Sequence, residues 1–150
     1  MTNIIQAGAQ APNFTLNDQN GNAVSLADFK GKKVLLSFHP FAFTSVCTDQ
    51  MRSLDNHVEA FAEKNTVVLG VSVDPEPSKK AWATVISLGE LAILSDFPQS
   101  QVAKAYGVYN EELSSSGRAN ILIDETGKVI WSRNYPIPEL PDLKEVFAQL

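Results

Sequence analysis

The chain has one cysteine, Cys47, and two histidines among its 150 residues. A single thiol cannot form a disulfide within the chain. Two histidines and one cysteine also show no recurring metal-ligand spacing, so we expect neither a disulfide nor a metal site. Nothing in the sequence indicates another cofactor. A lone thiol is either an inert core residue, as free cysteines often are, or a reactive group.

Long apolar runs and basic clusters are also missing. No stretch approaches the roughly 20 apolar residues that span a bilayer, and residues 1–6 have neither the basic segment nor the apolar run of a signal peptide. The formal net charge is −5, from 17 acids against 12 bases, and no Lys or Arg run exceeds two residues. We therefore expect no nucleic-acid or membrane partner. With a single thiol and no signal, the sequence predicts a cytoplasmic protein.

The overall amino-acid composition is typical of an ordered globular protein. Hydrophobic residues make up 44% and charged residues 19% of the chain, close to ordinary usage. A chain of this length can bury a sizeable core. Because we find no repeat, linker or change in composition, we predict a single domain over residues 1–150.

Hydrophobic periodicity and turn residues predict an α/β protein. An N-terminal hairpin is expected around Asn20-Gly21, a strong two-residue turn signal. Strands alternating with helices imply parallel βαβ units, and a late hairpin adds an antiparallel pair, so we predict a central mixed sheet with helices on both faces. The predicted strands are 14–16, 23–26, 34–38, 66–73, 92–94, 118–123 and 129–132. The predicted helices run from the Cys47 region to about Lys64, then 78–87, 100–106 and 140–150.

Cys47 follows the strand 34–38 after a short loop. Ligands of such sheets bind beyond the carboxyl ends of the strands. If Thr44 or Ser45 caps the helix, Cys47 lies in the first turn, where unpaired N–H groups and the helix dipole favour an anion. Only the thiolate is nucleophilic. The position favours a reactive thiol, but both interpretations stay open on this observation alone.

A reactive thiolate needs a positive group from elsewhere in the fold, and Arg118 is the candidate. It opens a predicted strand, where a large cation is costly to bury unless an anion pairs with it. Its fixed fork of donors suits a thiolate and oxygen acceptors. The alternative is an arginine at the strand edge that reaches solvent. Gln50, three residues after Cys47, either orients Arg118 or is a solvated amide.

Three other residues near Cys47 have both a functional and an ordinary interpretation. Thr44 is a helix cap, or its hydroxyl turns toward the sulfur and bonds an incoming oxygen. Pro40 ends a strand, or its ring shields the sulfur from water. His39 invites a Cys-His pair of the protease type, but no Asn or Asp that would orient the ring stands out. We therefore interpret His39 as a positioning residue at the end of a buried strand.

The segment from Pro40 to Cys47 resembles the peroxiredoxin signature: a proline, three residues, a threonine, two residues and the reactive cysteine. With Arg118 at the start of a strand, all four hallmark positions of that family are present. The resemblance extends from Gly8 to the C-terminal helix. Three segments are similar to the one-cysteine peroxiredoxins of the alkyl hydroperoxide reductase E type. They are Trp82-Ala-Thr, Leu94-Ser-Asp-Phe and Ala105-Tyr-Gly-Val-Tyr-Asn-Glu.

This resemblance implies a thioredoxin-like fold and a thiol peroxidase. Cys47 would attack a hydroperoxide and become a sulfenic acid. Arg118, Thr44 and the backbone N–H groups of Val46 and Cys47 would stabilise the departing oxygen. No cofactor is implied. With no second cysteine in the chain, an external thiol or redox protein must reduce the sulfenic acid. The resemblance also implies a homodimer packed around the active-site loops.

The nature of the peroxide is only weakly indicated. Phe41, Phe43 and Val46 are apolar neighbours of the predicted site and favour alkyl or lipid peroxides. Many peroxiredoxins carry Glu at the position of Gln50, so the charge balance around Arg118 differs here.

Other classes of function are compatible with parts of this pattern. Oxidation of Cys47 could alter a partner contact, which would make the chain a redox sensor. An inert thiol in a structural thioredoxin-like domain is a third interpretation. A dithiol oxidoreductase is disfavoured, because Gln50 stands where such enzymes carry their second cysteine.

Overall fold

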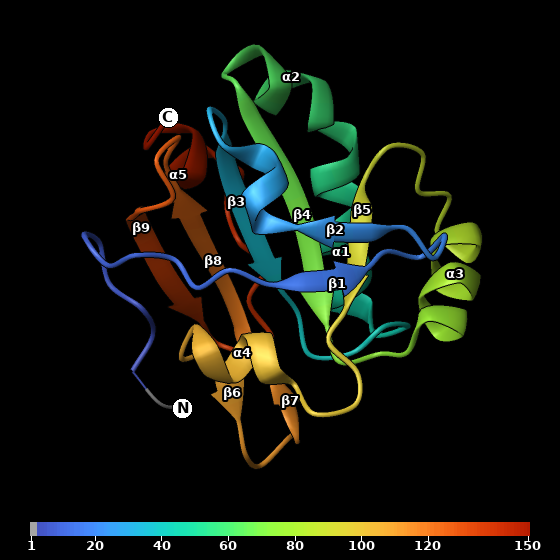
Figure 1. Ribbon diagram of the computed structural model, residues 1–150. Helices are drawn as coiled ribbons and strands as arrows, with labels where there is room; N and C mark the ends of the chain where they lie inside the picture. The colour runs from blue at the N-terminus through green and yellow to red at the C-terminus, as the bar shows by residue number, and fades with distance from the viewer. Residues whose placement is uncertain (1–2) are drawn as a thin grey trace.

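The computed structural model describes residues 3–150. Seven strands form one sheet, and a separate two-stranded hairpin projects from it (Figure 1). The sheet strands are β1 (Thr15–Asn17), β2 (Ala23–Ser25), β3 (Lys33–Phe38), β4 (Thr66–Ser72), β5 (Ala92–Ser95), β8 (Arg118–Ile123) and β9 (Val129–Tyr135). The helices are α1 (Ser45–Asn56), α2 (Val58–Glu63), α3 (Glu76–Val85), α4 (Gln101–Ala105) and α5 (Leu143–Phe147), with a short 3₁₀ turn, η1, at Leu26–Phe29.

The sheet has the order β2-β1-β5-β4-β3-β8-β9 and is mixed. Strands β3, β4 and β5 are parallel, whereas β8 and β9 run antiparallel to their neighbours. The hairpin β1–β2 joins the opposite edge in antiparallel fashion. The structure thus confirms the predicted α/β class, the mixed sheet and the N-terminal hairpin.

Apolar side chains form a core on each face of the sheet. Helix α4 covers one face, where Tyr106 packs near Phe14 and Phe38. Helices α1, α2, α3 and α5 contribute to the core of the other face, and α1 lies behind the sheet in Figure 1. Cys47 belongs to this second core. The strands between the two cores are buried on both faces, which explains why their sequences are mostly apolar.

The single helix predicted to reach about Lys64 is two helices, and this prediction was wrong. Helix α1 ends at Asn56, and His57 adopts φ −114° and ψ 9° before α2 begins at Val58. The His57 ring Nδ1 lies 2.7 Å from the carbonyl oxygen of Ser53. Asn and His are weak helix formers, and here a side chain interacts with the backbone where the helix breaks.

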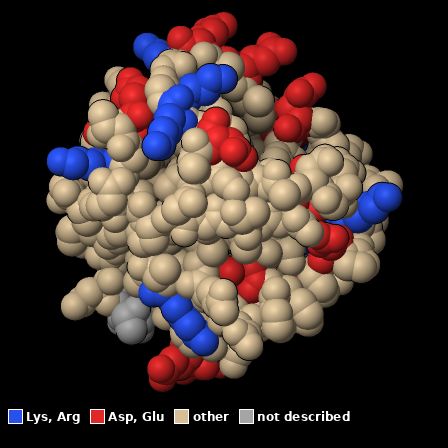
Figure 2. Space-filling view, viewed as in Figure 1, with Lys and Arg blue, Asp and Glu red and all other residues tan. Residues whose placement is uncertain are grey.

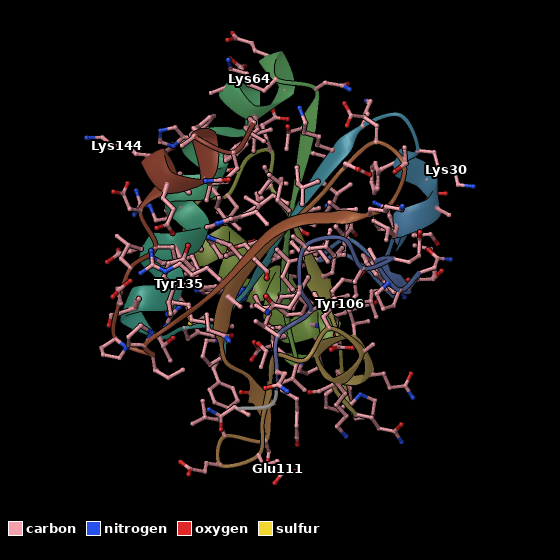
Figure 3. The ribbon with its side chains drawn as sticks, turned by 90° about the vertical axis from the view of Figure 1, so that its left-hand side faces the viewer. Lys30, Lys64, Tyr106, Glu111, Tyr135 and Lys144 are labelled. Carbon is pink, nitrogen blue, oxygen red and sulfur yellow. The ribbon has the colours of Figure 1, made fainter. Side chains whose placement is uncertain are left out.

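Other differences concern short elements. The hairpin formed by β6 (Tyr109–Asn110) and β7 (Ser115–Ser116) was not predicted. Its tip carries Glu111, which projects from the body of the protein in Figure 3. Strand β9 continues to Tyr135, three residues beyond the prediction. The C-terminal helix is shorter than expected and begins only at Leu143.

Charged side chains of both signs are interspersed over the face shown in Figure 2. Among residues 3–150, no helix has the length and apolar character needed to cross a bilayer.

Candidate active site

Cys47 is the third residue of α1 and lies immediately beyond the carboxyl end of β3. The chain leaves β3 at Phe38 and crosses residues 39–43, and Thr44 takes the extended N-cap conformation. The Cys47 side chain is 1% exposed. First-turn N–H groups have no partner within their own helix, so the sulfur lies where an anion is favoured.

The register of the sheet places Arg118 beside Cys47. It is the first residue of β8, and the next residue, Ala119, pairs with Phe38 at the end of β3. Arg118 Nη1 donates to Cys47 Sγ at 3.4 Å, and its Nε donates to the carbonyl oxygen of Ile137 at 2.9 Å. The guanidinium is 2% exposed. This side chain does not reach solvent.

Gln50 is buried and holds Arg118 in place. Its Oε1 accepts from Arg118 Nη1 at 2.6 Å, while its Nε2 donates to Ser37 Oγ at 2.7 Å and to the Phe38 carbonyl at 3.3 Å. The amide therefore links the guanidinium to β3. Within residues 3–150 no carboxylate forms an ion pair with Arg118. The Cys47 thiolate would be the anion closest to this buried cation.

Thr44 occupies the helix N-cap, but its hydroxyl does not cap the helix. Thr44 Oγ1 donates to the carbonyl oxygen of Phe41 at 2.8 Å, rather than turning toward the sulfur as the sequence suggested. The residue is exposed and still lines the hollow around Cys47. Rotation about one side-chain bond would be needed to direct the hydroxyl at a bound peroxide.

A pocket of about 250 Å³ opens onto Cys47 and Arg118. Its walls are mostly apolar, and two of them come from segments far away in the sequence, at Leu113 and at Ile137-Pro138. Sequence analysis missed these residues because they follow short or irregular elements with no periodic signal. The other lining residues are Pro40, Phe41, Thr44, Ser45 and Val46.

Phe43 is not part of this pocket, contrary to the sequence-based expectation. It is 56% exposed and adopts a positive φ of 68°. Its ring lies 6.4 Å from that of Trp82, measured between centroids. Phe41, by contrast, lines the pocket.

A larger hollow of about 450 Å³ lies elsewhere, between the N-terminal hairpin and the start of α3. It contains none of the candidate residues, and its lining is polar and apolar in similar measure. Size alone therefore does not identify the reactive site here. The smaller pocket combines a thiol with a buried cation.

A group of polar residues that are at least partly buried packs near the loop of residues 39–43, which precedes Cys47. His39 is fully buried, and neither ring nitrogen has a hydrogen-bond partner, so it forms no Cys-His pair. Burial, with the nearby charge of Lys79, holds the pKa of His39 well below its usual value. Asp74 Oδ2 accepts from the backbone N–H of Ala42 at 2.8 Å and so anchors the loop.

Lys79 is part of this group and was missed by sequence analysis. Its side chain is 0% exposed, and Nζ has no hydrogen-bond partner. Burial lowers the pKa of Lys79 to about 7, against the opposing effects of Asp74, Cys47 and Asp96. One signal was available: Lys79 lies three residues before Trp82 and four before Ala83 on the buried face of α3.

The described residues contain no cluster of three or more His, Cys, Asp or Glu side chains that could hold a metal ion.

A mixed sheet of this order, with a thiol in the first turn of a helix against a buried guanidinium, defines a thiol-based redox protein. Residues 7–132 match the model of the AhpC/TSA family. Alkyl hydroperoxide reductase E of Mycobacterium tuberculosis is 40% identical over 126 residues, which are 83% of this chain and 82% of that protein. A thiol peroxidase of Staphylococcus saprophyticus is 36% identical over 85% of this chain and 76% of its own length.

Solved structures agree with this assignment. The reduced 2-Cys peroxiredoxin of Plasmodium vivax superposes with a TM-score of 0.86 at 32% identity, and the match covers 93% of this chain and 77% of that one. The fold is therefore the thioredoxin-like fold of peroxiredoxins. The chain belongs to the AhpC/TSA family, and it is a thiol-dependent peroxidase of the peroxiredoxin class.

Proposed function

We propose that Cys47 is the peroxide-reacting nucleophile and that the chain reduces hydroperoxides by a one-cysteine cycle. The observation that carries this proposal is the contact of Arg118 Nη1 with Cys47 Sγ at 3.4 Å, at the base of an apolar pocket. A cation in this position favours the thiolate, which is the reactive form. The mostly apolar walls suit an organic hydroperoxide, in keeping with the name of the mycobacterial relative.

In the first half of the cycle, the sulfur attacks one peroxide oxygen. The S–O bond forms as the O–O bond breaks, so the sulfur is oxidised and the peroxide is reduced to an alcohol or to water. The departing oxygen carries negative charge and takes up one proton. Arg118, the Thr44 hydroxyl and the backbone N–H groups of Val46 and Cys47 stabilise that charge, and the ring of Pro40 shields the sulfur from water.

The second half of the cycle needs a reductant from outside, since the chain has one cysteine. An external thiol attacks the Cys47 sulfenic acid, and a second thiol then resolves the mixed disulfide. We place this reaction in the cytoplasm. We also propose a homodimer, because the exposed apolar residues Phe43, Ile137 and Leu140 lie on or beside the loops around the pocket.

Intact mass spectrometry tests the proposal directly. Reduced protein is mixed with a slight excess of hydroperoxide, and Trp fluorescence is followed in parallel. Trp82 is a suitable reporter, because its Nε1 donates to Thr48 Oγ1, next to Cys47, at 3.3 Å. We expect a gain of one oxygen, mapped to Cys47, within about a second at micromolar peroxide. An unchanged mass at Cys47 would contradict the assignment.

Gln50 should affect the rate through the orientation of Arg118. Gln50→Leu removes the acceptor for Arg118 Nη1, so we expect the second-order rate constant of Cys47 oxidation to fall by about tenfold, the value of one hydrogen bond to a charged group. Stopped-flow Trp fluorescence measures this constant. Gln50→Glu keeps an acceptor in place and should lose less. Equal rates for Gln50→Leu and the unmodified protein would show that Arg118 does not depend on Gln50.

The pocket wall should select for organic peroxides. Ile137→Ser removes apolar surface but keeps the backbone carbonyl that accepts from Arg118 Nε. We expect kcat/KM for cumene hydroperoxide to fall by about fivefold, as the loss of roughly 1 kcal/mol of apolar contact implies, while the value for hydrogen peroxide changes little. Leu140→Ser is the matched control, because Leu140 is exposed but does not line the pocket. A parallel loss for both peroxides would argue against this role.

A further inference from the structure

Gly70 lies within β4 at a position where a side chain would have no room. It pairs with Ser37 of β3 on one side and with Ile93 of β5 on the other. A Cβ atom at Gly70 would lie 2.6 Å from Met51 Sδ and 3.0 Å from Ile93 Cγ2. Its φ lies outside the left-handed region that favours glycine. The restriction on this position therefore comes from the neighbouring side chains and not from the backbone conformation.

Met51, which occupies this space, belongs to the helix that carries Cys47. It lies four residues after Cys47, one turn further along the same buried face of α1. The side chains around the Cβ position are fully buried: Met51, Ile93 and also His39, whose Cε1 lies 3.6 Å from it. To make room for a Cβ, the sulfur would have to withdraw from 2.6 Å to at least the 3.4 Å of ordinary contact. A core packed like a crystal has little space for such a movement, so the contact between Met51 and Gly70 limits how closely α1 approaches the sheet.

The residue before Met51 is Gln50, and it contacts the adjacent strand. Gln50 Nε2 donates at 2.7 Å to the Oγ of Ser37, which is the strand partner of Gly70. Gln50 Oε1 accepts at 2.6 Å from Arg118 Nη1, the atom that contacts the reactive sulfur. Two neighbouring positions of the sheet thus receive two successive residues of α1. Any displacement of Met51 from Gly70 would therefore act on Gln50 as well.

We propose that Gly70 is a positioning residue for the reaction of Cys47: by leaving space for Met51, it seats α1 at the depth that the active site requires. At that depth Gln50 holds Arg118 against the sulfur. The proposal rests on Cys47 being the nucleophile. Gly70 and Met51 do not line the pocket, so they do not touch the peroxide. Hydrogen bonds weaken as their distance and angle depart from the optimum, so a small shift of α1 is enough to change the rate.

Gly70→Ala tests the proposal by adding the one carbon atom for which there is no room. We expect the second-order rate constant of Cys47 oxidation to fall by about three- to tenfold, and by no more than in Gln50→Leu, because the substitution acts through that hydrogen bond. Stopped-flow Trp fluorescence with full-length protein measures this constant. Gly89→Ala is the matched control, because the nearest atom to a Cβ at Gly89 is Asp55 Oδ2, at 4.0 Å. It should react at the normal rate.

Two double substitutions distinguish positioning from a general loss of stability. In a Gln50→Leu background, Gly70→Ala should cause little further loss of rate, because the side chain that transmits its effect is absent. Met51→Ala removes the sulfur that the new Cβ would meet. The variant Gly70→Ala/Met51→Ala should therefore react faster than Gly70→Ala and as fast as Met51→Ala alone. Its Tm should still lie below that of the unmodified protein, because truncation of a buried methionine leaves a cavity. A rate that recovers while Tm does not is the result that positioning predicts.

The outcomes separate two failures. If a folded Gly70→Ala protein reacts at the normal rate, or if its loss multiplies with that of Gln50→Leu, the role of Gly70 is wrong and the peroxidase assignment stands. If intact mass shows no added oxygen at Cys47 in the unmodified protein, the nucleophile has been misassigned and the proposal fails with it. Circular dichroism checks that each variant is folded. If Gly70→Ala does not fold, Gly70→Ala/Met51→Ala is compared with Met51→Ala: equal rates support the proposal, and a slower double variant contradicts it.

Discussion

Replacing Arg118 by alanine is expected to slow oxidation of Cys47 by on the order of 10²-fold or more. The guanidinium acts twice, because it favours the thiolate and also stabilises the oxygen that departs. Loss of a single donor that stabilises developing negative charge in an enzyme costs about 10²- to 10³-fold. Arg118 Nη1 lies 3.4 Å from the sulfur. Stopped-flow fluorescence with pseudo-first-order peroxide measures the second-order rate constant.

Two further variants make this result specific. Arg118→Lys keeps a charge but loses the fork that reaches Cys47, Gln50 and Ile137 together, so it should recover only part of the rate. Arg133→Ala removes an exposed arginine whose partners are Glu139 and Glu145, and it should react at the normal rate. Circular dichroism checks that each variant is folded. A folded Arg118→Ala protein that reacts at full speed would show that another group activates Cys47.

The parts of the fold that were predictable are those with a strong local signal. Strands β3, β4 and β8 are buried between the two cores, so their sequences are predominantly apolar. The hairpin β1–β2 was predicted from the turn signal Asn20-Gly21. In contrast, β6 and β7 have two residues each, and their conformation depends on pairing with one another. Pairing between such short segments has no periodic pattern from which it could be inferred.

The predictable part of the site is also local. Pro40, Thr44 and Cys47 lie within eight residues and occupy one loop and one helix start. Arg118 is 71 residues from Cys47, and its selection depended on the cost of burying a cation and on the resemblance to peroxiredoxins. The antiparallel register of β3 and β8 then explains the contact.

The remainder of the site could not be inferred from the sequence, for physical reasons. Leu113 and Ile137 form pocket walls only because the turn between β6 and β7 and the segment after β9 both reach the pocket around Cys47. The direction of the Thr44 hydroxyl depends on the position of the Phe41 carbonyl. Phe43 has a positive φ and lies outside the pocket. Each of these features is set by tertiary packing or by one backbone torsion, and neither is encoded in residue spacing.

Lys79→Met is expected to stabilise the protein, most strongly below pH 7. Burial lowers the pKa of Lys79 from 10.5 to about 7 in the folded state, whereas the unfolded chain has the ordinary value. Below pH 7 the lysine is charged in both states, and the cost of burying that charge is fully present. Each tenfold loss of proton affinity corresponds to about 1.4 kcal/mol, so this cost is on the order of 3–5 kcal/mol.

As the pH rises from about 7 toward 10.5, the folded state releases the proton before the unfolded state does. The free energy of unfolding therefore increases over that interval, and the advantage of methionine shrinks. Asp74 and Asp96 keep their backbone hydrogen bonds in the variant, which limits the loss from removing a cation. Thermal unfolding at pH 6 should show a rise in Tm of on the order of 6–20 °C, at about 2–4 °C per kcal/mol.

Lys80→Met is the matched control, because Lys80 is exposed and its removal should shift Tm little at any pH. The same comparison at pH 10 should reveal a much smaller effect of Lys79→Met. A Tm that falls in Lys79→Met at pH 6 would mean that the charge of Lys79 stabilises the fold, through Asp74 and Asp96, by more than burial costs. A constant gain from pH 6 to pH 10 would reflect packing alone, and the folded state would then hold the Lys79 proton as firmly as the unfolded chain does.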